Sequence, residues 1–129
     1  MINGRFLNNR MPELATYEGK VRYFELYERS KIKKDSCVLV IASNTMVGDD
    51  PYATISDELK ECRRFVQYLR RNTTADILCT LKTHNEVTKH VGSKEVDVII
   101  DMHELHTRQV DYILDKLGKS RSDMINLFP

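Results

Sequence analysis

The sequence has few residues that break regular structure and no long apolar run. Its 129 residues include five glycines and three prolines, with 41% hydrophobic and 30% charged residues, the profile of a globular chain and not of a disordered one. No segment approaches the roughly 18 to 20 apolar residues that cross a bilayer, and the N-terminal MINGRFLNNRM lacks the apolar core of a signal peptide. We therefore expect a cytoplasmic protein with no membrane contact.

Cysteine and net charge are also low. The three cysteines, Cys37, Cys62 and Cys79, are odd in number and share no CxxC spacing, which favours buried reduced thiols. The formal net charge of +1 gives no overall attraction to nucleic acid or to anionic membranes. Any such attraction has to come from a local cluster of charge.

Recognised catalytic motifs are missing as well. The segment SNTMVGDDPYAT has one glycine and no lysine, which excludes a P-loop and the GxGxxG dinucleotide motif. Neither HExxH nor a nucleophile elbow is present. The sequence therefore predicts a class of architecture more directly than it predicts a reaction.

What the sequence does contain is an alternation of strands and helices from residue 37 onward. CVLVIAS (37–43) is a continuous β-branched run, typical of a strand buried on both faces of a parallel sheet. ILCTLK (77–82) and VDVIID (96–101) predict two more strands. The segment DMINLFP (123–129) is either a fourth strand or a last helical turn, and we favour the strand.

Segments with helical periodicity lie between these predicted strands. One apolar face follows a helix start at Thr54 or Ser56, and it consists of Ile55, Leu59, Cys62, Phe65, Val66 and Leu69. EVTKHV predicts a short helix, and a further helix runs from Thr107 to a stop at Gly118. This order predicts a single α/β domain over residues 1–129, with three to four mostly parallel strands and helices on both faces.

The first 36 residues form an N-terminal extension whose structure the pattern leaves open. Leu14, Tyr17, Val21 and Phe24 suit one face of a helix, whereas KVRYFELY alternates well enough for a strand. The segment is rich in aromatic residues, and so much aromatic area is rarely left in water. We expect it to pack on the core or on a partner, with Tyr23 and Phe24 as contact residues.

Polar side chains gather where the predicted strands end, which is where open α/β sheets bind ligands. His84, Asp101 and His103 are candidate catalytic groups, because histidine titrates near neutral pH. Asp101, His103 and His106 are candidate ligands for a divalent metal such as zinc. The alternative, an ordinary polar rim in which His106 and Thr107 only start a helix, stays open.

Basic residues form two clusters. RSKIKK contributes Arg29, Lys31, Lys33 and Lys34, and the second cluster lies on the helix that ends near residue 72. The candidate binding residues on that helix are Arg63, Arg64, Arg70 and Arg71. Arginines on one helix can contact nucleic-acid phosphates or an acidic protein surface, although a solvated helix face has the same composition.

Without a recognised motif, a small domain more often binds than catalyses. We therefore expect a non-enzymatic binding or regulatory protein, without a cofactor, that docks on a larger macromolecular machine such as one that processes nucleic acid. Its partner would be a protein, with nucleic acid contacted through the arginine-rich helix. The alternative is a metal-assisted hydrolase or nucleotide-processing enzyme, with a divalent metal at the strand ends.

Overall fold

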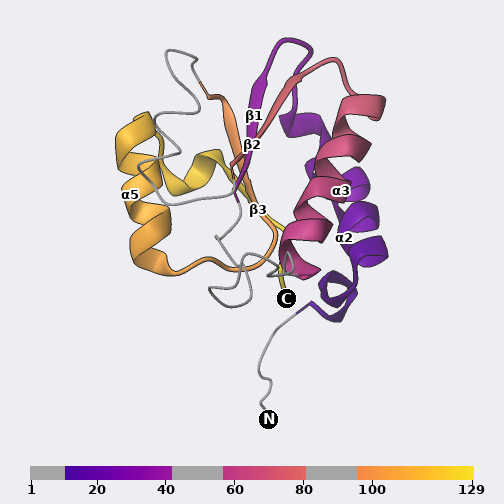
Figure 1. The fold of residues 1–129 in the computed structure, drawn as a ribbon. Coiled ribbons are helices and arrows are strands. Elements are labelled where there is room, and N and C mark those ends of the chain that lie inside the picture. The colour runs from indigo at the N-terminus through magenta and orange to yellow at the C-terminus, as the bar shows by residue number, and fades with distance from the viewer. Residues whose placement is uncertain (1–10, 42–56, 81–95) are drawn as a thin grey trace, which may run out of the picture.

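The computed structural model describes residues 11–41, 57–80 and 96–129, which form one sheet with helices on both faces (Figure 1). The strand order is β2-β1-β3-β4, and all pairings are parallel. The strands are β1 (Cys37–Ile41), β2 (Asp76–Thr80), β3 (Val98–Asp101) and β4 (Met124–Asn126). The predicted α/β class and the favoured strand near the C-terminus are confirmed.

Helices α2 and α3 cover one face of the sheet, and α5 covers the other (Figure 1). The helical elements are η1 (Pro12–Ala15), α2 (Tyr17–Tyr23), η2 (Phe24–Glu28), η3 (Arg29–Lys31), α3 (Asp57–Asn72), α5 (Thr107–Leu117) and η4 (Arg121–Asp123). The described N-terminal residues are therefore helical up to Lys31, apart from a break at Thr16, and the alternative strand at KVRYFELY is not formed. The predicted helix at EVTKHV lies outside the described residues.

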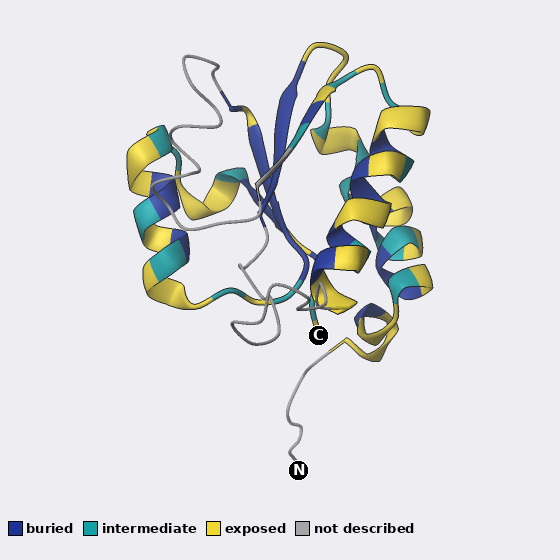
Figure 2. Cartoon of the chain, in the orientation of Figure 1, coloured by how far each residue is buried: buried dark blue, intermediate teal, exposed yellow. Residues whose placement is uncertain are grey.

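The core consists of two apolar layers, one on each side of the sheet (Figure 2). Successive residues of β1 point to opposite layers: Val40 belongs to the layer under α3 with Phe65, and Leu39 to the layer under α5 with Ile113. All five residues of β1 are buried, which explains their continuous apolar character. The predicted burial of Cys37 and Cys62 is confirmed, and the side chain of Cys79 lies outside the described residues.

The N-terminal helix is fixed by a close backbone approach. The Thr16 side chain caps α2 by accepting a hydrogen bond from the Gly19 N–H at 3.0 Å. A Cβ atom at Gly19 would lie 1.6 Å from the carbonyl oxygen of Glu13, so only glycine fits where η1 folds back on α2. With η1 folded back in this way, Leu14 of η1 and Phe24 at the end of α2 both belong to the core layer that includes α3.

One strand differs slightly from its predicted bounds for a local reason. The third strand begins at Val98, not at residue 96, because the Asp97 side chain is exposed and its carboxylate accepts the Cys37 N–H at 2.7 Å.

At the edge of the sheet, the Arg70 guanidinium donates to the Ile77 carbonyl of β2 at 2.9 Å. Arg70 thus covers part of an exposed strand edge.

Helix α5 begins and ends as the sequence predicts. Its N-cap is His106, whose Nδ1 accepts the Arg108 N–H at 3.1 Å. Gly118 ends the helix in the left-handed conformation with φ of 66°. In the part of the chain that the structure describes, no helix combines the length and apolar character needed to cross a membrane.

Candidate functional site

The carboxyl ends of β1 and β3 form a topological switch point. These strands are neighbours, and the helices that follow them, α3 and α5, pack on opposite faces of the sheet. Ligands in open α/β sheets bind at such a point. Of the residues predicted to act there, Asp101, His103 and His106 are described, whereas His84 lies outside the described residues.

The Asp101 carboxylate holds the turn after β3. It is 2% exposed, and its two oxygens accept the backbone N–H groups of His103 and Leu105, each at 3.0 Å. Burial raises the pKa of Asp101, and these backbone hydrogen bonds act in the opposite direction. Because both oxygens are already in use, this carboxylate acts mainly as a structural acceptor.

A buried ionic cluster, formed by Lys20, Glu61 and His103, lies beside this turn. Oε1 of Glu61 is 3.4 Å from Lys20 Nζ and 3.5 Å from His103 Nε2. Lys20 is 4% exposed and also donates a hydrogen bond to the Met102 carbonyl. The ionic cluster therefore links α2, α3 and the turn after β3.

The surroundings of the His103 imidazole favour its neutral form. Burial lowers its pKa, and the positive charge of Lys20 lowers it further, while Glu61, Glu58 and Asp101 act in the opposite direction. The facing atoms, Glu61 Oε1 and His103 Nε2, are buried and make no hydrogen bond within the described residues. The ionic cluster thus holds the turn after β3 against α2 and α3.

The three predicted metal ligands do not converge. Asp101 is engaged in its turn, and His106 is an exposed helix cap. Among residues 11–41, 57–80 and 96–129, no three histidine, cysteine, aspartate or glutamate side chains come close enough to hold a metal ion. Part of the predicted polar rim is thus accounted for by turn and cap formation.

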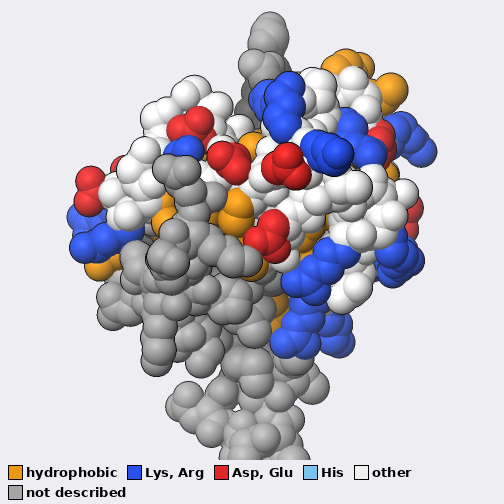
Figure 3. All heavy atoms as spheres, turned by 90° about the horizontal axis from the view of Figure 1, so that it is seen from above, with side chains coloured by type: hydrophobic (Ala, Val, Ile, Leu, Met, Phe, Trp, Pro, Cys, Tyr) orange, Lys and Arg blue, Asp and Glu red, His pale blue; other side chains and the backbone are white. Residues whose placement is uncertain are grey.

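The opposite end of the sheet, before the first residues of β1 and β2, carries a different feature, a hollow of about 410 Å³ next to the end of α3. We call it the basic trough; its cationic lining residues are Arg29, Lys33, Lys34 and Arg71. The remaining described lining residues are Ile32, Asn72, Thr73 and Thr74, so no described carboxylate lines it. Figure 3 is a view onto this end of the sheet and shows Lys and Arg side chains gathered over part of it.

A second hollow of about 460 Å³ continues the basic trough toward β3. It shares Lys33 and Lys34 with the first hollow and adds Lys31. Its lining also includes Asp35 and Asp97, so its charge is mixed. The two hollows share Lys33 and Lys34, and of the two only the basic trough is lined by cations without a described carboxylate.

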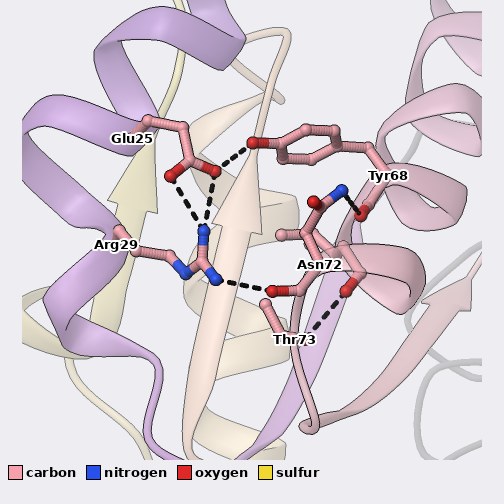
Figure 4. Close-up of polar contacts among 6 residues, drawn as sticks. Glu25, Arg29, Tyr68, Asn72 and Thr73 are labelled. Carbon is pink, nitrogen blue, oxygen red and sulfur yellow. Dashed lines mark hydrogen bonds and ion pairs between the residues drawn. The ribbon is translucent and has the colours of Figure 1, made fainter.

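A polar clamp fixes one wall of the basic trough (Figure 4). Arg29 makes two 2.8 Å contacts with the Glu25 carboxylate and donates to the Asn72 carbonyl at 2.5 Å. The Tyr68 hydroxyl also donates to Glu25, and burial together with this hydrogen bond raises the pKa of Tyr68 to about 12. The clamp joins η2 and η3 to the end of α3, so this wall is formed in advance of any ligand.

The four predicted arginines of the helix have separate environments. Arg71 lines the basic trough, and Arg70 is bound to the β2 edge. Arg64 lies over the Tyr17 ring, 4.1 Å from its centroid, and Arg63 is exposed. Of the four, only Arg71 is among the described residues that line the basic trough.

The two aromatic residues predicted as contacts, Tyr23 and Phe24, also have different environments. Phe24 is fully buried, and its ring lies edge-on to that of Phe65 with 5.4 Å between the two centroids. Phe24 is therefore a core residue and not an exposed contact residue. Tyr23 is half-buried, and its ring lies 4.8 Å from that of Tyr27. The exposed apolar side chains of this segment are Leu26 at 65% and Tyr27 at 64%.

Sequence reasoning missed Lys20 and Glu61. The one available signal was that Lys20 lies within the apolar helical face of Tyr17, Val21 and Phe24, where a charged residue needs a buried partner. No protein-family model, curated protein or solved structure matches this chain.

Proposed function

We propose that this chain is a non-enzymatic binding protein that docks on a larger machine handling nucleic acid, and that its basic trough contacts the phosphate backbone. The observation that carries the proposal is the lining of the 410 Å³ hollow, where four cationic side chains from two separate segments converge without a described carboxylate. Lysine and arginine are the residues that neutralise phosphates.

The arrangement of charge supports a local contact. Lys33, Lys34 and Arg71 are exposed, so phosphates can reach them without a conformational change. The Glu25 carboxylate offsets part of the positive charge of Arg29, and its two hydrogen bonds fix the orientation of the Arg29 guanidinium group. Because the chain as a whole has a net charge of only +1, attraction depends on this cluster and not on overall charge.

Such a contact gives affinity and position but no sequence preference. Phosphate contacts orient a protein on nucleic acid, whereas sequence is read at the base edges. Non-specific binding of this type has dissociation constants of about 10⁻⁴ to 10⁻⁶ M at physiological salt. This range suits an accessory protein whose remaining affinity comes from protein contacts in the same assembly.

The test compares charge reversal inside and outside the basic trough. In Lys33→Glu with Lys34→Glu, we expect the turn to be retained, because the Lys33 N–H still donates to the Ser36 hydroxyl at 2.9 Å and only the Lys33 Nζ bond to the Ser30 carbonyl at 3.1 Å is lost. The matched control, Lys60→Glu with Arg108→Glu, changes the charge equally at exposed positions in the first turns of α3 and α5.

The measurement is fluorescence anisotropy with a labelled oligonucleotide, with polyglutamate as a competitor of the same charge sign. We expect the trough variant to bind at least about tenfold more weakly than the control variant. Equal binding by the two variants would contradict the proposal. Displacement of the oligonucleotide by polyglutamate at an equal concentration of negative charge would also contradict it, in favour of an acidic protein partner.

A further inference from the structure

The basic trough has a shape that suits one strand better than a duplex. Reading a duplex through its major groove requires a projecting helix or β-ribbon. Here the cations line a concave surface built from η3, the turn that follows it and the end of α3. The nearest helix terminus is the carboxyl end of α3, where Arg29 already binds the Asn72 carbonyl.

An exposed aromatic residue lies next to this surface in the chain. Tyr27 is 64% exposed and precedes Lys31, a cation of the second hollow, by four residues, so the two side chains lie about one helical turn apart beside the hollows that share Lys33 and Lys34. Figure 3 shows hydrophobic side chains beside Lys and Arg side chains on the same face.

The local backbone explains why this ring is exposed. Residues Phe24–Glu28 form a π-helical turn, in which Phe24 points into the core while Leu26 and Tyr27 remain outside. Single π-helical turns are rare and often occur at functional sites. The Tyr23 ring packs against the core, and its centroid lies 4.8 Å from that of the Tyr27 ring. This contact restricts the positions of the Tyr27 ring.

We infer that the partner of the basic trough is single-stranded nucleic acid, with its phosphates on the trough cations and a base stacked on Tyr27. Proteins that bind single strands without sequence preference combine a cationic groove with aromatic side chains on which bases stack. The charge of the groove and the exposed, supported ring provide both parts. This inference rests on the proposed function and specifies the form of nucleic acid that is bound.

The experiment measures the anisotropy of labelled oligothymidylate and oligouridylate of roughly 12 nucleotides, and of a duplex of the same length. Tyr27→Ala removes the ring and Tyr27→Phe keeps it. Leu26→Ala is the control, because Leu26 is its exposed neighbour in the same turn. We expect single strands to bind more tightly than the duplex, and Tyr27→Ala to weaken single-strand binding about tenfold with little effect on the duplex. Tyr27→Phe and Leu26→Ala should bind like the unmodified protein.

Binding of the duplex as tightly as the single strand, or equal binding by Tyr27→Ala and Leu26→Ala, would overturn this inference. In that case, sensitivity to Lys33→Glu with Lys34→Glu would leave the proposed function intact. Absence of binding to all three oligonucleotides would overturn both. A difference between oligothymidylate and oligouridylate identifies whether DNA or RNA is preferred, and preference for either over the duplex supports the inference.

Discussion

Nζ of Lys20 lies 3.4 Å from Oε1 of Glu61, and it joins two helices that are far apart in the sequence. The Lys20 side chain is 5% exposed and that of Glu61 is 25% exposed, so the pair is largely removed from water. Breaking a buried ion pair is costly, because it leaves the remaining charge without a partner. The integrity of the α2 and α3 layer therefore depends on this contact.

We predict that Lys20→Met lowers the free energy of unfolding by about 2 to 4 kcal/mol. Methionine retains the apolar stem but leaves Glu61 and the Met102 carbonyl without their donor. Denaturant unfolding measures the loss, and Lys60→Met, at a side chain that is 64% exposed, is the control. Adding Glu61→Gln to Lys20→Met should restore part of the stability. If Lys20→Met costs no more than Lys60→Met, the ionic cluster does not stabilise the fold.

The His103 environment predicts a dependence of stability on pH. Its pKa is lowered from 6.5 by burial and by Lys20, so the unfolded chain takes up a proton at a higher pH than the folded chain does. Stability should therefore fall as the pH drops below about 6.5. Thermal unfolding from pH 7.5 to 5 compares the protein with His103→Gln, which cannot titrate. Parallel curves for the two proteins would show that His103 does not contribute.

Gly19 predicts a local steric effect. Because a Cβ atom would lie 1.6 Å from the Glu13 carbonyl oxygen, Gly19→Ala forces η1 away from α2. We expect a loss of about 1 to 3 kcal/mol, although alanine is the better helix former. The exposed helical position Arg22→Ala is the control. Stabilisation by Gly19→Ala would mean that η1 does not pack on α2 as described.

The alternation of strands and helices could be predicted from the sequence because it is encoded locally. The apolar run of β1 and the helical face of α5 are each visible within about ten residues. The basic trough could not be predicted, because it depends on the turn after η3 lying beside the end of α3. Both basic clusters are evident in the sequence, but their adjacency is a property of the tertiary structure.

The strand-end residues illustrate the same limit. Asp101 and His106 were predicted correctly to lie at the end of a strand and the start of a helix, yet polar residues there serve turns and caps as readily as ligands. The burial of Phe24 agrees with the apolar helical face that it shares with Tyr17 and Val21, whereas the π-helical turn that begins at Phe24 changes the register of the residues after it. A regular helical or strand pattern does not anticipate such a change.

The most direct test of the account is the salt dependence of single-strand binding. Each phosphate neutralised contributes about −0.7 to the slope of log K against log salt. We predict a measurable negative slope for the unmodified protein, reduced by about 1 to 1.5 in Lys33→Glu with Lys34→Glu, because two phosphate contacts are lost. The same slope in both proteins would contradict the claim that the basic trough binds phosphate.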